Sequence, residues 1–379
     1  MTETADLIVL GAGATGSAAA YHAARRNLRV ILLEQFEIDH QRGSSYGASR
    51  IIRYAYDHPA YVRLVRAAYP AWAELEREAG ETLVYPTGGV DIGRRGEPPF
   101  EATLQTLRDE EIPFELLDPA EAQRRFPQFR LDADMLMIYQ ADAAVLPASR
   151  CVQAHVRLAE QYGAVVHTGE PVQSVELRDH GVTVRTARQT YSAAAMVLTA
   201  GAWANDLLTP LGFPLPLRPV RCQENYFAPL HPASYEAGAM PVLVAHLPEY
   251  PFRPYGLPSL DGSGFKLGQH GGSDFDPHRA DRPMDEDALA SVRQFAERHL
   301  PGATNQHLSS RVCLYTMTPD EHFIVDAHPA YPHLIVGAAC SGHAFKFSPV
   351  LGSILVDLAT EGVTLHDISL FRASRFSQG

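Results

Sequence analysis

The feature that most constrains this chain is a glycine-rich turn near its N-terminus, placed between an apolar run and a helix-forming stretch. The apolar run covers residues 6–10, the turn reads GAGATG at residues 11–16, and an alanine-rich, helix-forming stretch continues to about residue 26. A second apolar run at residues 30–33 ends on Glu34. This is the strand–helix–strand context that a dinucleotide fingerprint requires.

Each glycine of the turn has a physical task. Gly11 permits the tight turn, Gly13 lets backbone N–H groups approach a pyrophosphate, and Gly16 lets the helix pack closely on the strand. The positive end of the helix dipole then faces the phosphates. Glu34 can accept hydrogen bonds from ribose hydroxyls, and its charge would repel the 2′-phosphate of NADP. The sequence therefore predicts a bound dinucleotide other than NADP.

Composition limits the class of protein. The 379 residues suggest two domains, and a mean hydropathy of −0.14 is typical of a soluble protein. The net charge of −12 disfavours nucleic acid and anionic membranes as partners. No apolar run approaches the roughly 20 residues that span a bilayer, and the N-terminus has no basic segment of a signal peptide. We therefore expect neither membrane insertion nor export.

Cysteine usage agrees with a cytoplasmic location. The four cysteines are widely spaced, without a CxxC pair, at Cys151, Cys222, Cys313 and Cys340. This pattern is typical of reduced thiols and predicts neither a disulfide framework nor a metal site.

Several longer stretches indicate secondary structure. Residues 60–79 have apolar residues at helical spacing, and Pro70 inside them predicts a kink or a break. Residues 98–126 have a charged helical pattern with a break at Pro113, and residues 172–185 alternate like two strands joined by a turn.

Features of a nucleotide domain occur at the start, the middle and the end of the chain. A strand at 195–199 opens onto a second tight turn at Gly201, and a strand at 334–338 precedes a C-terminal helix. Between them, residues 220–317 have strands and loops with one helix near 284–300. We predict a mixed α/β (α+β) fold with a Rossmann-like dinucleotide domain and a second, mainly β substrate domain. The predicted ranges are 1–85, 146–218 and 318–379 for the first domain, and 86–145 and 219–317 for the second.

Seven motifs give the chain a specific resemblance. They are GAGATG at 11–16, GASRIIRYAY at 47–56, LTAGAW at 198–203, YGLPS at 255–259, FKLGQH at 265–270, VCLYTMTPDEHFIVD at 312–326 and SGHAFKFS at 341–348. In these motifs and their order the chain resembles the monomeric sarcosine oxidase and N-methyltryptophan oxidase family, FAD-dependent amine oxidases of the D-amino-acid oxidase superfamily. The resemblance covers essentially the whole chain and implies a glutathione-reductase-like FAD fold.

The resemblance implies that FAD is bound covalently through Cys313, as a thioether to the 8α-methyl group of the flavin. Such a bond requires a thiolate, which neighbouring positive charge favours. Arg311 and His322 are close in sequence. The alternative for Cys313 is a buried structural cysteine. Further cofactor contacts implied by the resemblance are Gly11, Gly13, Gly16, Glu34, Ser44, Arg50, Val172, Gly201, Gly342, Phe345 and Lys346.

Lys266 and His270 lie four residues apart in a strand-like pattern, which places both side chains on one face. The resemblance places Lys266 beside the flavin, where a fixed ammonium would stabilise the superoxide formed as O₂ is reduced. It also implies that Tyr255 and His270 line the substrate cavity. The alternatives are a solvated surface lysine and ordinary packing of the other two side chains.

Arg53 and Lys346 are, by resemblance, the clamp for the carboxylate of an amino-acid substrate, and Arg50 lies near the flavin. The planar guanidinium of arginine matches a carboxylate in bidentate fashion. A cationic site also disfavours the ammonium form of the bound amine, whose lone pair must be free. Without that context, Arg50 and Arg53 could be surface residues or partners in local salt bridges.

Two stretches depart from the family pattern. Ser45 and Tyr46 stand where the family loop GSHHGDTR has two histidines, so any role of those histidines toward the flavin does not transfer. The stretch 245–254 carries an additional arginine, Arg253, ahead of Tyr255. The identity of the substrate side chain is therefore left open.

The resulting hypothesis is an FAD-dependent oxidase of a secondary amino acid, either N-methylated or cyclic. Hydride transfer to the flavin would give an imine, and O₂ would be reduced to hydrogen peroxide. We expect a cytoplasmic monomer that acts on a small amino acid. The alternatives are a dehydrogenase or another amino-acid oxidase of the same fold, including one with noncovalent FAD, and a non-catalytic FAD-binding subunit; an NAD-dependent dehydrogenase has less support.

Overall fold

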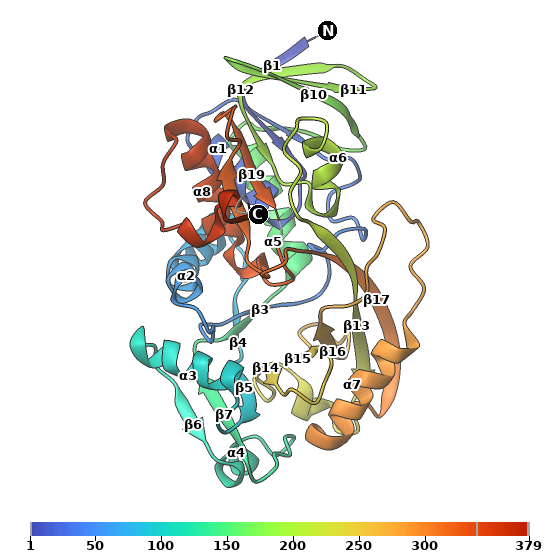
Figure 1. Cartoon of the computed structure of the whole chain (residues 1–379). Helices are drawn as coiled ribbons and strands as arrows, with labels where there is room; N and C mark the ends of the chain where they lie inside the picture. Colours follow the sequence, from blue (N-terminus) through green and yellow to red (C-terminus); the bar gives the residue numbers. More distant parts are fainter. Residues whose placement is uncertain (1, 339, 377–379) are drawn as a thin grey trace.

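The computed structural model describes residues 2–338 and 340–376, and two eight-stranded sheets organise them. Figure 1 shows β1, β10, β11 and β12 of the first sheet in the upper part of the molecule and the second sheet in the lower part. Within the described residues, no helix is long and apolar enough to cross a bilayer.

Parallel strands form the centre of the first sheet. Their spatial order is β9 (Val165–His167), β2 (Val30–Leu33), β1 (Thr2–Leu10), β12 (Thr190–Leu198) and β19 (Leu334–Ala338). Antiparallel strands β10 (Val172–Arg178), β11 (Gly181–Thr186) and β18 (Ile324–Ala327) extend it. Because the parallel strands come from distant parts of the sequence, the sheet brings these parts together at one edge.

Helices cover the parallel strands. Helix α1 (Ala14–Arg25) packs against α5 (Ala148–Gln161) and α8 (Ser348–Glu361). A Cβ atom added at Gly352 would lie 2.6 Å from the backbone of Ala18, so α8 approaches α1 closely. Helix α2 (Pro59–Ala79) runs without interruption past Pro70. The predicted break does not occur because Pro70 lies on the exposed face while Trp72 stays buried against the core.

The second sheet is mainly antiparallel. Its order is β17 (Gln306–Met317), β13 (Arg218–Ala228), β16 (Phe265–His270), β15 (Arg253–Leu257), β14 (Val242–His246), β5 (Gly89–Arg94), β7 (Met135–Gln140) and β6 (Glu115–Leu117). Helix α7 (Glu286–His299) packs on β13 and β16. The predicted helical stretch 98–126 divides into α3 (Pro98–Asp109) and α4 (Pro119–Arg125), because β6 between them pairs with β7 and buries Leu117.

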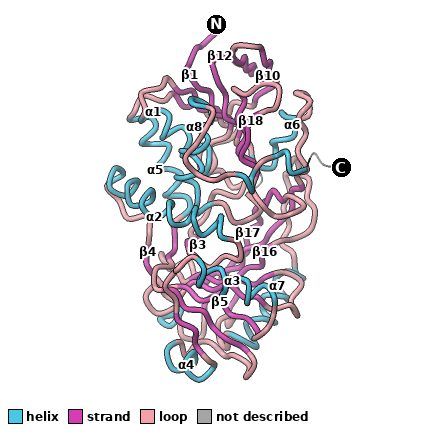
Figure 2. The backbone as a smooth tube through the Cα atoms, turned by 60° about the vertical axis from the view of Figure 1, so that its left-hand side comes forward, coloured by secondary structure: helices cyan, strands magenta, loops and turns pink. Residues whose placement is uncertain are grey.

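A small third sheet contains Arg50 in its first strand. It consists of β3 (Arg50–Ile52), β8 (Ala144–Leu146) and β4 (Tyr85–Pro86), and Figure 2 shows β3 and β4 between helix α2 and the second sheet. Short helices complete the chain: η1 (Gly201–Trp203), α6 (Ala204–Leu208), η2 (Pro232–Tyr235), η3 (Phe345–Phe347), η4 (Ser369–Phe371) and η5 (Ala373–Phe376). The mixed α/β fold is as predicted; the assigned domain boundaries stay a prediction.

The glycine-rich turn has the geometry that the sequence predicts. Gly11 has a φ of +94°, and a Cβ atom there would lie 2.7 Å from the backbone oxygen of Thr199. A Cβ atom at Gly16 would overlap the backbone oxygen of Gly11. The turn therefore requires glycine at both positions for steric reasons.

We expect Gly16→Ala to lower the free energy of unfolding by about 1–3 kcal/mol or more, although alanine favours helices, because backbone must move to accommodate the methyl group. Urea unfolding measures the change. Gly43→Ala is the control, since the nearest atom to its new methyl group, in the ring of His40, lies 3.4 Å away. Equal losses in the two variants would contradict the steric explanation.

Candidate active site

An open cavity follows the carboxyl ends of the parallel strands, and its empty volume, with the solvent at its mouth included, is about 1650 Å³. Leu10, Leu33, Thr199 and Ala338, at or next to the ends of four strands, line it. Ligands of open α/β sheets bind at this edge. Nine of the residues predicted to contact the cofactor also line it: Gly11, Gly13, Glu34, Ser44, Arg50, Val172, Gly201, Gly342 and Phe345.

Glu34 is held rigidly at this edge. Its Oε2 accepts a hydrogen bond from the backbone N–H of Ala12 at 2.8 Å, and its Oε1 accepts one from Phe36 at 2.9 Å. The backbone N–H of Ala14, in the first turn of α1, donates to the hydroxyl of Ser45 at 2.9 Å. The glycine turn, the helix N-terminus and the carboxylate together fit the pyrophosphate and ribose of a dinucleotide. Gly16, whose close neighbours are Gly11 and Thr199, is not among the described residues that line the cavity.

A second cavity of about 1090 Å³ adjoins the first, since Arg50, Tyr315, Gly342 and Phe345 line both. Gly342 has a φ of +77°, and a side chain there would overlap the ring of Tyr315. All six predicted catalytic residues line this second cavity: Arg50, Arg53, Tyr255, Lys266, His270 and Lys346. Lys266 and His270 lie on one face of β16, as their even spacing predicts.

Arg53 and Lys346 are buried cations on one side of the second cavity. Arg53 Nη1 lies 3.4 Å from Asp91 Oδ1, which also contacts His246 Nε2 at 2.8 Å. Lys346 Nζ donates to the hydroxyl of Tyr56 at 2.9 Å and forms no ion pair with a described carboxylate. Burial and the charge of Arg53 hold the pKa of Lys346 well below its ordinary value.

A second charged cluster lies where the two cavities meet. Lys266 is 2% exposed, and its Nζ donates to Glu224 Oε1 at 2.7 Å and to the backbone oxygen of Ser49 at 3.1 Å. Arg50 Nη1 lies 3.1 Å from the same oxygen of Glu224. Sequence reasoning did not find Glu224, because it belongs to no recognised motif. The only signal is a charged residue in an otherwise largely buried strand, β13.

His270 is a neutral group in this setting. Burial, together with the charges of Arg253, Lys346 and Arg53, lowers its pKa to about 3. Arg253 stands opposite His270 in the pairing of β15 with β16 and lines the same cavity. The additional arginine noted in the sequence therefore belongs to the site.

Cys313 is buried on β17, on the same strand face as Tyr315, which lines both cavities. Among the described residues that form the cavity walls, Cys313 itself is absent. Burial and the charge of Glu224 raise the pKa of its thiol to about 12, against the opposing charges of Arg50 and Lys266. The resting group is therefore a thiol.

The cations that act on Cys313 are not those suggested by proximity in sequence. The guanidinium of Arg311 lies over the ring of Tyr226, 5.3 Å from its centre, and His322 Nδ1 contacts the hydroxyl of Tyr61 at 2.9 Å. The loop 43–50, which departs from the family pattern, contacts the strand of Cys313, because the hydroxyl of Tyr46 donates to the backbone oxygen of Val312 at 3.0 Å.

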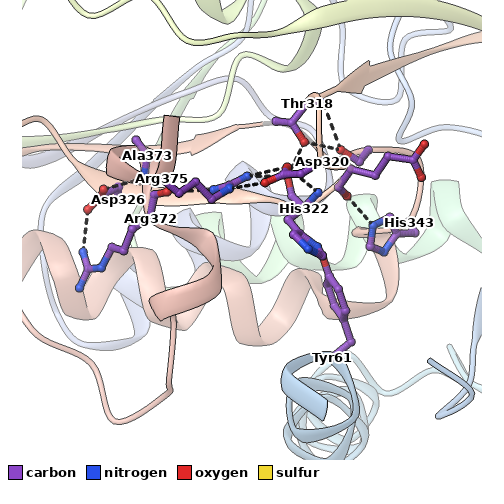
Figure 3. Close-up of polar contacts among 11 residues, drawn as sticks. Tyr61, Thr318, Asp320, His322, Asp326, His343, Arg372, Ala373 and Arg375 are labelled. Carbon is purple, nitrogen blue, oxygen red and sulfur yellow. Dashed lines mark hydrogen bonds and ion pairs between the residues drawn. The ribbon is translucent and has the colours of Figure 1, made fainter. Parts of the chain in front are cut away.

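Asp320, Glu321 and His322 of the segment 318–326 line the second cavity, and Figure 3 shows how the segment is held. Arg375 Nε donates to Asp320 Oδ2 at 2.7 Å, which attaches the segment to the C-terminal part of the chain. His322 joins it to helix α2 through Tyr61. Elements from both ends of the sequence thus position the cavity wall.

Comparison with known proteins agrees with this geometry. The family described as FAD dependent oxidoreductase (DAO) matches residues 6–358. A peroxisomal sarcosine oxidase of Mus musculus is 38% identical over 99% of this chain and 97% of its own. A monomeric sarcosine oxidase of Arthrobacter sp. strain TE1826 is 35% identical (98% and 96%), and an N-methyl-L-tryptophan oxidase of Salmonella arizonae is 31% identical (98% and 99%).

Among solved structures, the open form of NikD, described as an unusual amino acid oxidase, superposes with a TM-score of 0.87. It is 27% identical and covers 98% of this chain and 97% of its own. The chain therefore belongs to the family of FAD-dependent oxidoreductases, and the family identifies FAD as its cofactor. The predicted resemblance to sarcosine and N-methyltryptophan oxidases is confirmed.

We expect Asp91→Asn to lower the free energy of unfolding by about 3–5 kcal/mol, because it leaves the charge of Arg53 buried without a counter-ion. Urea unfolding measures the loss. The matched control is Asp134→Asn, which removes an Arg94 ion pair of 2.7 Å whose aspartate side chain is 61% exposed. That surface pair should contribute less than about 1 kcal/mol. A small loss in Asp91→Asn would show that the buried pair is not needed for stability.

Proposed function

We propose that this chain is an FAD-dependent oxidase of secondary amino acids, N-methylated or cyclic, that releases an imine and hydrogen peroxide. The observation that carries the proposal is the pair of buried cations, Arg53 and Lys346, in a small cavity that adjoins a dinucleotide cavity. The named activities of the sarcosine and N-methyltryptophan oxidases support the same substrate class.

The residues that line the first cavity would hold FAD, with its pyrophosphate at the glycine turn and its ribose at Glu34. Residues shared by both cavities, Arg50, Tyr315, Gly342 and Phe345, would hold the flavin ring. FAD bound there would supply a two-electron acceptor for the hydride on the substrate carbon next to nitrogen, with O₂ as the final acceptor of the electrons.

Donors in the second cavity remain available for a substrate carboxylate. Arg53 Nη1 makes no hydrogen bond to any described residue. Lys346 Nζ uses two of its three N–H groups, on the hydroxyl of Tyr56 and the backbone oxygen of His343. A bound carboxylate would accept hydrogen bonds from Arg53 and Lys346 and would favour the charged form of Lys346.

The same charges prepare the amine of the substrate. Arg53, Arg253 and Lys346 surround a site whose histidine, His270, is neutral. An ammonium group bound there would be repelled, so the substrate amine loses its proton more readily and presents its lone pair. Direct hydride transfer from a neutral amine requires no charged general base.

We also propose that Cys313 forms a thioether with FAD. The support is the VCLYTMTPDEHF motif and the position of Cys313 on the strand face of Tyr315. Because burial raises the pKa of the thiol to about 12, formation of the thioether requires that the thiol lose its proton to become the nucleophilic thiolate. The charges of Arg50 and Lys266 favour that loss.

We further propose a cytoplasmic monomer. The name of the Arthrobacter relative supports the oligomeric state. The four cysteines of the chain are free, which is typical of a reducing compartment.

We expect purified protein precipitated with acid to retain yellow colour in the pellet, and its mass to exceed that of the chain by one FAD. Cys313→Ser should release the colour into the supernatant. Cys222→Ser is the matched control, because Cys222 is also buried and stands opposite Cys313 in the pairing of β13 with β17. If the colour stays in the supernatant for the unmodified protein, FAD is held without the bond.

We expect N-methylglycine, N-methyltryptophan or a cyclic amino acid such as proline or pipecolate to yield hydrogen peroxide in a coupled assay. Arg53→Gln and Lys346→Gln should each lower kcat/KM by about 10- to 150-fold, since a hydrogen bond to a charged group contributes about 1.5–3 kcal/mol. Arg63→Gln on the exposed surface of α2 is the control.

Substrate-dependent flavin bleaching without peroxide would identify a dehydrogenase of the same fold. Unchanged kcat/KM in both clamp variants would contradict the proposed carboxylate site. Absence of bleaching with every secondary amino acid would contradict the substrate class.

A further inference from the structure

We propose that Glu224 is a positioning residue that keeps Lys266 protonated and directed into the second cavity, and thereby controls how the enzyme reduces O₂. The inference rests on the proposed oxidase function and concerns a residue outside every motif of the sequence. It begins from the geometry of the buried cluster of Arg50, Glu224 and Lys266.

Glu224 is placed by the register of three neighbouring strands. On β13 it pairs with Gly268 of β16 on one side and with Arg311 of β17 on the other. Lys266 stands two residues from Gly268 and pairs with Tyr226, whose side chain shares a strand face with Glu224. The carboxylate, in a residue only 3% exposed, thus lies beside the Lys266 ammonium at 2.7 Å.

Arg50 and Lys266 differ in whether they keep a free N–H group after their hydrogen bonds within the protein. Arg50 donates to the backbone oxygens of Ser44, Tyr46 and Ser49 and also contacts Glu224. Lys266 has three N–H groups, of which Glu224 and Ser49 accept two. The third is left for the cavity that Lys266 lines. Lys266 is therefore the cation of the cluster that can donate to an oxygen species in the cavity.

Glu224 also decides whether that amine is charged. Burial and the charge of Arg50 lower the pKa of Lys266 and the charge of Glu224 raises it, with a net value of about 8. Burial would raise the pKa of Glu224 itself, but the charges of Lys266 and Arg50 hold it below its ordinary value. The other titratable groups around the cluster are Tyr46 in the loop before β3, Tyr226 on β13, Tyr255 on β15, and Cys313 and Tyr315 on β17.

The chemical consequence concerns the second half of the reaction. O₂ takes up two electrons and two protons and becomes hydrogen peroxide, and negative charge develops on oxygen before the protons arrive. A protonated Lys266 stabilises that charge, whereas a neutral amine does not. With one anion between two cations the cluster keeps a net positive charge, so Glu224 holds Lys266 charged without cancelling the field.

The test uses the FAD-loaded protein, reduced by substrate without oxygen and then mixed with O₂ in a stopped-flow instrument at a series of pH values. The rate of reoxidation should fall as pH rises through the pKa of Lys266. Glu224→Gln should move this midpoint down by at least about one pH unit, which lowers the rate about threefold midway between the two midpoints and about tenfold at a pH above both. Flavin reduction by substrate is recorded separately in each variant.

Two further variants keep the test decisive. Glu224→Asp moves the carboxylate away from Lys266 by the length of one methylene group, so it should lower the midpoint by a smaller amount. This variant still tests the inference if Glu224→Gln does not bind FAD. Tyr226→Phe removes the 3.1 Å hydrogen bond to Glu224 Oε2 but keeps the carboxylate charge, so its midpoint should stay at the original value. Unshifted midpoints in the glutamine and aspartate variants would overturn the inference.

Lys266→Met separates this inference from the function on which it rests. If that variant reacts with O₂ as fast as the original protein, the proposed role of Lys266 itself is wrong. If it reacts slowly while the Glu224 variants retain the original midpoint, Lys266 acts on O₂ but Glu224 does not control it.

Discussion

The central constraint on this structure is that several positively charged side chains are buried. Each needs an anion nearby, either a carboxylate of the protein or one of a bound ligand, because an isolated charge in a low-dielectric interior is costly. Glu224 accompanies Lys266 and Arg50, and Asp91 accompanies Arg53. Lys346 has no such partner among the described residues, and the anion that suits it is the carboxylate of a substrate.

The architecture follows from where these charges must meet. The first sheet presents the ends of its parallel strands, where a glycine turn and a helix N-terminus suit phosphates. The second sheet contributes Lys266, His270 and Glu224 from adjacent antiparallel strands. Strand β3 brings Arg50 to the place where the two cavities adjoin. Neither sheet alone contains the complete site.

Much of the site could be predicted because its residues occur in contiguous motifs. The turn at 11–16 depends on local backbone geometry, and the glycine, strand and helix patterns that predict it are all local in the sequence. The break near Pro113 was predicted, but the strand at residues 115–117 was not, and helix α2 continues past Pro70, where a kink or a break was predicted. Both depend on burial against distant segments, which outweighs local preference. The cations near Cys313 were missed for the same reason, since they come from other strands.

The sequence by itself determined the dinucleotide turn, the family and six of the side chains that line the second cavity, because those signals are residue types at fixed spacings. Only the tertiary structure decided which charges pair. The register of β13 against β16 brings Glu224 to Lys266, and the parallel pairing of β5 with β14 brings Asp91 to His246. It also decided which groups ionise, because the pKa of a buried group depends on the depth of burial and on charges from elements distant in sequence.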